Sequence, residues 1–319
     1  MSQTSSEALE PSRDEAAPGE PEITTAGVPE RNGKALLGWI QEPDVRPLYY
    51  GAAVTTPWNV EDFVEECAAR RGAKPSAPET APAPPTATAL PESLEAQASA
   101  LRATDQFRTQ YQPFGAVFAA VPLADLVAPQ WWVDAEYVDV LTAGAPAEDD
   151  LDGMFGFSFA TGRLARPMLL GTNGAAFASA RGDIGGLTPL RVARYSPEKV
   201  TFEFDVIPRP NWVWLAVVQG MNRLLILNGV HHLLALLKAG RQHAFCLVRQ
   251  AESLGDLQAM GWNFQDPALF KPGELTAARP PLLRDYIDQQ HAADVGIRLR
   301  QNYLRLAVQP DPGVIPRVE

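Results

Sequence analysis

The sequence predicts an α+β protein built on a mixed β-sheet with short helices. Short apolar runs separated by Gly and Pro fill residues 154–218, a pattern typical of short strands joined by tight turns. An apolar strand over 223–227 then meets a Gly turn and a helix, and a further strand follows over 243–249.

The N-terminal part of the chain divides into segments of contrasting composition. Residues 1–34 are rich in Ser, Glu, Pro and Ala and contain almost no large apolar side chains, so we expect a disordered arm. Residues 73–106 repeat this composition and are predicted to form a semi-extended Pro/Ala-rich linker. Between them, residues 35–72 form a short island that contains apolar and aromatic side chains.

The island contains a clear helix signal. Thr56 or Asn59 would cap a short amphipathic helix whose first turns are acidic, as the helix dipole favours. Its apolar positions follow a helical spacing: Val60, Phe63, Val64 and Cys67. Either the island packs back on the main domain, or it is a docking element that a partner protein receives in a groove. For the second case the candidate partner-binding residues are Trp39, Tyr49, Tyr50, Trp58 and Phe63.

The main domain is predicted over residues 107–308, with a tail over 309–319. Its expected strands are 116–121, 154–159, 167–170, 190–195, 200–206, 212–218, 223–227 and 243–249. Its expected helices are a short turn over 122–126, a helix over 134–141, one from Val230 to the terminating Gly240, and one over 282–291. Residues 295–308 fit a strand or a helix equally well, because their periodicity matches neither pattern clearly.

Charge and cysteine content narrow the class of protein. The formal net charge of −11 argues against a broad nucleic-acid surface, which needs clustered Lys and Arg. Cys67 and Cys246 lie far apart in the sequence, so a disulfide framework is not expected and a reducing compartment fits better. No apolar run approaches the roughly 18 residues that span a bilayer, and the N-terminus lacks a secretory apolar region. We therefore expect a cytoplasmic protein with no membrane contact.

The turn after residue 227 is the predicted ligand site. A strand that ends in Asn228-Gly229 and opens a helix leaves the first amides of that helix unpaired, and such amides suit anions. Two of the four histidines, His231 and His232, stand at the same turn. Asn228, Gly229, His231 and His232 are therefore the candidate residues for a phosphate or a nucleotide.

Two segments resemble a known family. The run Val121-Pro122-Leu123-Ala124-Asp125-Leu126 and the run from Leu225 to Gly240 look like the two ends of the ParB/sulfiredoxin-like domain. The resemblance covers residues 114–250 and implies a small mixed sheet, with a phosphate or nucleotide held by the Gly turn and the following helix.

The family residues carry over one at a time. Asn228 stands where an acidic residue is usual, Gly229 matches the glycine, and His231 matches the histidine. His232 replaces the family's arginine, and losing that guanidinium should weaken phosphate binding by about 1–3 kcal/mol. The span between the two motifs is long, so the strands over 154–195 are interpreted as an insertion in a degenerate domain.

Other chemistry finds little support in the sequence. The turn has no cysteine for sulfiredoxin chemistry, and residues 250–319 offer too little helix and positive charge for a helix-turn-helix domain. A metal site would need ligands from His231, His232, His243 and Cys246. Adjacent histidines diverge on a helix, so we predict no metal and no cofactor.

The leading hypothesis is a bacterial-type cytoplasmic adaptor or regulatory protein that recruits a protein partner through residues 35–72. The alternative is a ParB-type nucleotide-dependent enzyme, a kinase or nucleotide hydrolase, acting at the Gly229 turn.

Overall fold

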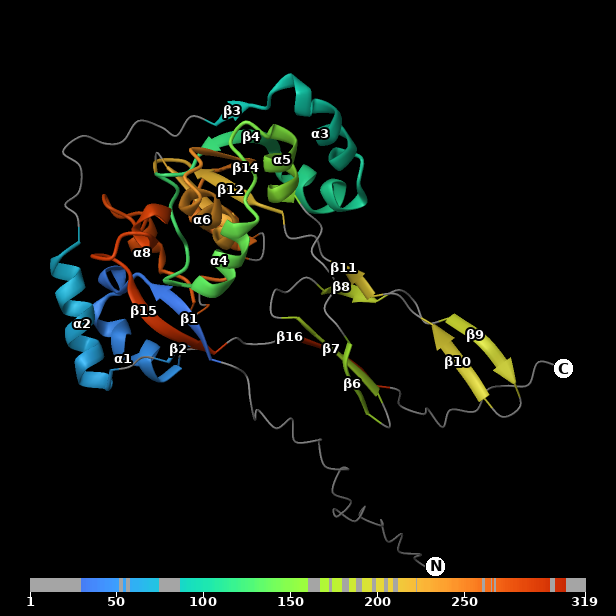
Figure 1. Cartoon of the computed structure of the whole chain (residues 1–319), viewed down its shortest axis with the longest axis horizontal. Coiled ribbons are helices and arrows are strands. Elements are labelled where there is room, and N and C mark those ends of the chain that lie inside the picture. Colours follow the sequence, from blue (N-terminus) through green and yellow to red (C-terminus); the bar gives the residue numbers. More distant parts are fainter. Residues whose placement is uncertain are drawn as a thin grey trace, which may run out of the picture.

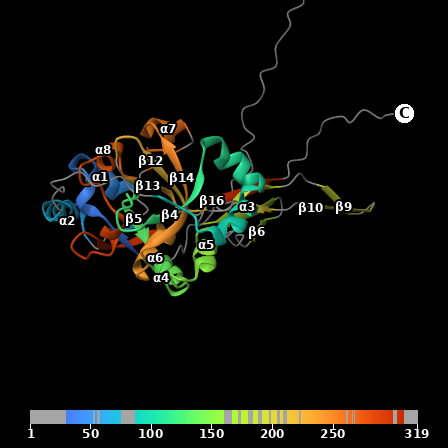
Figure 2. The same cartoon turned by 90° about the horizontal axis from the view of Figure 1, so that it is seen from above.

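Two sheets organise the part of the chain that the computed structural model describes (Figure 1). The described residues are 30–51, 54–55, 58–74, 87–159, 212–221, 223–259, 262–264, 266 and 268–298, together with the strands β6–β11 and β16. These last strands are β6 (Pro167–Gly171), β7 (Gly174–Ser179), β8 (Ile184–Leu187), β9 (Arg191–Ser196), β10 (Lys199–Glu203), β11 (Val206–Pro208) and β16 (Asn302–Ala307). In both views they lie to one side of the two main sheets (Figures 1 and 2).

The larger sheet has five strands in the order β13-β12-β14-β4-β3. They are β13 (Leu224–Asn228), β12 (Trp214–Val218), β14 (His243–Ala251), β4 (Val117–Pro122) and β3 (Thr88–Ala89). Strands β12 and β14 run parallel, whereas the other pairs are antiparallel. The mixed sheet of the predicted α+β class is thus confirmed.

The smaller sheet joins distant parts of the chain. Its order is β2-β15-β1-β5, with β2 (Val54–Thr55), β15 (Ala293–Arg298), β1 (Glu30–Ala35) and β5 (Trp132–Asp134). Strand β1 lies between two partners, pairing Gly33 with Val295 on one side and Lys34 with Val133 on the other. Residues 30–34, expected in the disordered arm, therefore form the strand that connects the N-terminal segment to the domain. Residues 1–29 of that arm lie outside the described part.

Helices cover these sheets. The α-helices are α1 (Glu42–Gly51), α2 (Val60–Gly72), α3 (Glu95–Arg102), α4 (Ala135–Ala143), α5 (Leu151–Phe159), α6 (Val230–Lys238), α7 (Leu254–Ala259) and α8 (Pro272–Leu275). Shorter helical turns are η1 (Leu37–Trp39), η2 (Glu92–Leu94), η3 (Phe107–Tyr111), η4 (Gln112–Phe114) and η5 (Leu283–Tyr286). Helices α4 and α6 pack together, α5 packs on β14, and α2 packs on η1 and α1.

The island over 35–72 packs on the main domain, which was the first of its two interpretations. Leu36 and Leu37 are fully buried in the same core as β12 and β13, and Trp39 is 1% exposed. Asn59 caps α2 as expected, because its side-chain oxygen accepts a hydrogen bond from the amide of Asp62 at 3.0 Å. Burial of this many apolar side chains offsets the entropy of ordering the segment.

The predicted linker is shorter than expected. Residues 75–86 lie outside the described part, but β3, η2 and α3 order the chain from residue 88 onward. Leu94 and Ala98 are fully buried. Their burial attaches the second half of the predicted linker to the core, although its composition is typical of a spacer.

Several predicted elements were wrong in type. Residues 154–159 belong to helix α5, which begins after Asp150, whose Oδ1 accepts a hydrogen bond from the amide of Gly153 at 2.9 Å. Pro122 ends strand β4 and residues 123–125 form a bend and turn rather than a helix, while the helix expected over 282–291 is only the short turn η5. The ambiguous stretch 295–308 contributes strands β15 and β16. Within the described residues, no helix is both long enough and apolar enough to cross a membrane.

Candidate functional site

The Gly229 turn has the predicted order of strand, turn and helix. Strand β13 ends at Asn228, Gly229 adopts φ +94°, and α6 begins at Val230. A Cβ on residue 229 would lie 2.8 Å from Cγ2 of Val213, closer than side chains approach one another. Both the left-handed backbone and this close approach require glycine here.

The side chain of Asn228 is used within the fold. Its Nδ2 donates a hydrogen bond of 2.7 Å to the carbonyl of Trp212, two residues before β12 begins. This bond holds the end of β13 against the neighbouring chain, and it occupies a donor that the ligand hypothesis assigned to a phosphate.

His231 is also engaged by the fold. Its Nε2 accepts a hydrogen bond of 3.1 Å from the amide of Asp134, which places the proton of the neutral ring on Nδ1. Asp134 in turn caps α4, accepting from the amide of Tyr137 at 2.9 Å, and pairs with Arg31 of β1 at 3.1 Å. His231 therefore fixes α6 to α4 and to the N-terminal strand.

His232 lies between aromatic rings. Its ring centroid is 5.3 Å from that of Phe157 and 6.4 Å from that of Tyr137, both in edge-on geometry. Such contacts hold the imidazole against α4 and α5 and need no ligand. The structure thus brings together all four predicted site residues, and it gives Asn228, His231 and His232 contacts within the fold.

The other histidines and the cysteines do not assemble a metal site. Nδ1 of His243 lies 3.5 Å from Glu148 at an exposed position, whereas Cys246 is fully buried and burial raises the pKa of its thiol. Burial likewise raises the pKa of Cys67 to about 12. In the described part of the chain, no group of three or more His, Cys, Asp or Glu side chains could hold a metal ion.

The predicted partner-binding aromatics form the contact between α1 and α2. Phe63 is 1% exposed and lies 5.6 Å from Tyr49 and 6.2 Å from Trp58, measured between ring centroids. Trp39 and Phe63 therefore cannot present their rings to a partner in this structure, because the core covers both. Tyr49 and Trp58 are half-buried, and the side chain of Tyr50 lies outside the described residues.

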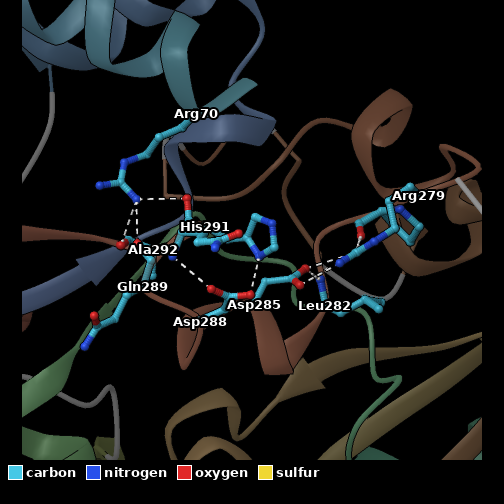
Figure 3. Close-up of polar contacts among 10 residues, drawn as sticks. Arg70, Arg279, Leu282, Asp285, Asp288, Gln289, His291 and Ala292 are labelled. Atoms are coloured by element: carbon cyan, nitrogen blue, oxygen red, sulfur yellow. Dashed lines mark hydrogen bonds and ion pairs between the residues drawn. The ribbon is translucent and has the colours of Figure 1, made fainter. Parts of the chain in front are cut away.

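A polar cluster that the sequence did not single out lies in the loop before β15 (Figure 3). Arg279 donates two hydrogen bonds to the carboxylate of Asp285, at 3.0 and 2.6 Å, and this carboxylate also accepts from the amide of Leu282 at 2.7 Å. Both charged side chains are at least nine-tenths buried. Trp39 binds the same loop, since its Nε1 donates to the carbonyl of Arg279 at 3.2 Å.

The far end of the same loop is held by helix α2. One nitrogen of Arg70 donates to the carbonyls of Gln289, Gln290 and Ala292, at 3.2, 3.2 and 2.9 Å, and Figure 3 shows its guanidinium directed at this end. These contacts position a loop rather than a reacting group.

Arg223 is the second residue that sequence reasoning missed. It lies just before β13, is 7% exposed, and is surrounded by Asp125, Arg279, Arg284 and Asp285. The sequence feature that could have identified Arg223 is its place immediately before a run of apolar strand residues, where a charge is costly to bury.

Comparison with known proteins gives no relative from which a site could be transferred: no family model, curated protein or solved structure matches the chain.

Proposed function

We propose that the protein acts by binding, as an adaptor or regulatory protein, and that the Gly229 turn is a structural junction of a degenerate ParB/sulfiredoxin-like domain. The observation that carries this proposal is the use of Asn228, His231 and His232 in contacts between β13, α4, α5 and α6. A phosphate at the turn would compete with these contacts for the same polar atoms.

The order of elements supports the family proposal. Strand β4 leads into the Pro122-Leu123 segment, and β13, Gly229, α6 and β14 follow one another as the second motif requires. The bond from the Leu123 amide to the carbonyl of Gln242, at 3.0 Å, places the start of one motif beside the end of the other.

For the partner, we propose the outward side of α1 and α2. Its exposed side chains include Glu42, Glu61, Asp62 and Glu65 beside Arg46, which pairs with Glu61 at 3.4 Å, so the surface has an acidic excess that suits a basic protein segment. The buried aromatics would act indirectly, by holding the two helices in place.

A thermal-shift experiment with a panel of nucleoside mono-, di- and triphosphates tests the binding role against an enzyme at the turn. We expect the melting temperature of the full chain to respond equally in wild type and in H231Q, because glutamine can still accept the hydrogen bond from Asp134. A nucleotide-dependent rise that H231Q removes, accompanied by turnover of the nucleotide, would establish the enzyme instead.

Copurification tests the partner proposal separately. An immobilised basic peptide of mixed Lys and Arg would be incubated with the full chain and, separately, with an E61Q/E65Q variant, and the amounts of protein retained would be compared. Binding should weaken in the variant and at high salt. Equal binding by both proteins would contradict a role for this surface.

A further inference from the structure

Arg223 is a largely buried cation whose guanidinium still reaches solvent, because none of its nitrogens is among the fully buried atoms that lack a partner. The side chain is 7% exposed, yet across the described residues its guanidinium has no hydrogen bond and no ion pair. Arginine carries five donors in a rigid fork, and a buried charge is normally paired. Burial lowers the pKa of this guanidinium, which is the effect expected where a cation is desolvated without full compensation.

Three chain segments converge on Arg223. The amide of Val127 donates to the carbonyl of Leu224 at 2.8 Å, and the amide of Leu283 donates to the carbonyl of Leu126 at 2.9 Å. The chain around Val127 therefore lies between β13 and η5. Arg223 precedes β13, Asp125 precedes the middle segment, and Arg284 follows Leu283, so these charged residues gather at one end of the three-segment array.

Among the described charges at this junction, three arginines face two carboxylates. Arg279 is paired with Asp285, and Arg284 is paired with Asp125 at 3.1 Å. The two carboxylates thus neutralise two of the three arginines. Arg223 supplies the uncompensated positive charge, and Arg284, whose side chain is half-exposed, can reorient toward a ligand.

We propose that Arg223 binds the oxyanion of a small ligand, a phosphoryl or carboxylate group, with Arg284 beside it. The flat fork of a guanidinium matches two oxygens of either group, and the resulting charge-assisted bonds would compensate the buried cation. The site lies about 20 Å from the Gly229 turn along β13, at 3.3 Å per residue. It deepens the proposed binding role by naming a ligand class, and it does not depend on the character of that turn.

Calorimetric titration of the full chain with inorganic phosphate and, separately, with acetate tests this site at constant ionic strength. We expect R223Q to weaken binding about 10- to 100-fold, and R223K to bind with intermediate affinity because lysine lacks the fork. R241Q is the control, since Arg241 is half-buried and donates through Nε to the carbonyl of Pro146 at 2.6 Å. Whichever of phosphate and acetate binds more tightly identifies the oxyanion.

A second variant keeps the test decisive if R223Q does not fold. D125N removes the carboxylate that competes for Arg284, and we expect it to tighten binding about threefold. Absence of binding by either anion at millimolar concentration would overturn the proposal, as would equal binding by wild type, R223Q and D125N. Binding that H231Q removes and R223Q preserves would place the anion at the turn, refuting both this site and the structural role of the turn.

Discussion

The polar side chains at the two ends of strand β13 differ in whether the fold supplies their hydrogen-bond partners. At its C-terminal end, Asn228 and His231 have the composition of an anion site, but their polar atoms are bonded to the backbone of Trp212 and Asp134. At its N-terminal end, Arg223 belongs to no motif, and although it is 7% exposed, no residue in the described part of the chain bonds its guanidinium. The comparison teaches that residue type at a turn does not show whether the polar atoms there remain available, because contacts within the fold can already use them.

The largest expected effect on stability concerns Asp285, the carboxylate that pairs with the buried Arg279. Replacing Asp285 with Asn leaves Arg279 without its carboxylate, so we expect the free energy of unfolding to fall by about 3–5 kcal/mol in urea titrations. D288N is the control, because Asp288 is half-exposed where it meets His291 and its loss should cost under about 1 kcal/mol. Equal losses would show that burial does not distinguish the two carboxylates.

At the other end, Gly229→Ala should cost about 2–4 kcal/mol of unfolding free energy, the sum of left-handed strain and the clash with Val213. G240A isolates the first contribution, because Gly240 has φ +79° with no atom within 4 Å of an added Cβ. The difference between the two variants, measured by urea denaturation, is the steric part. If G229A proved no worse than G240A, the turn would be less tightly packed than described.

A smaller effect is expected at His231. H231A removes the acceptor of the Asp134 amide and should lower the unfolding free energy by about 1–3 kcal/mol. H231Q should recover part of this loss, since its amide oxygen can accept the same hydrogen bond. H243A serves as a control at an exposed position. If H231A were as stable as wild type, the imidazole would be available for a ligand and the comparison would fail.

The smallest effect is expected at Arg223. R223M keeps an apolar stem of similar length and removes a cation that the fold leaves uncompensated, so the unfolding free energy should change by less than about 1 kcal/mol. The same substitution at Arg279 should cost about 3–5 kcal/mol, because it strands the buried Asp285. A large loss in R223M, seen by thermal or urea unfolding in anion-free buffer, would mean that the fold itself requires this guanidinium.

Sequence patterns predicted those helices, turns and caps that depend on neighbouring residues. The strand, Gly turn and helix at 224–238 follow from apolar periodicity and from glycine, and the cap at Asn59 follows from its place before an acidic first turn. Helix α5 was missed because a short apolar run fits a strand as well as a buried helix.

By itself the sequence determined the α+β class, the turn at Gly229 and the amphipathic helix after Asn59, since each depends on residues close together in the chain. Only the tertiary structure decided that residues 30–35 form a central strand, because their partners lie near residues 133 and 295. It also decided that the polar atoms of the turn are occupied, whereas the described residues provide no bonded partner for the guanidinium of Arg223. The hydrogen bonds at the turn join residues 16 and 97 positions apart, and such contacts leave no local periodicity, so no sequence pattern records which polar groups the fold has satisfied.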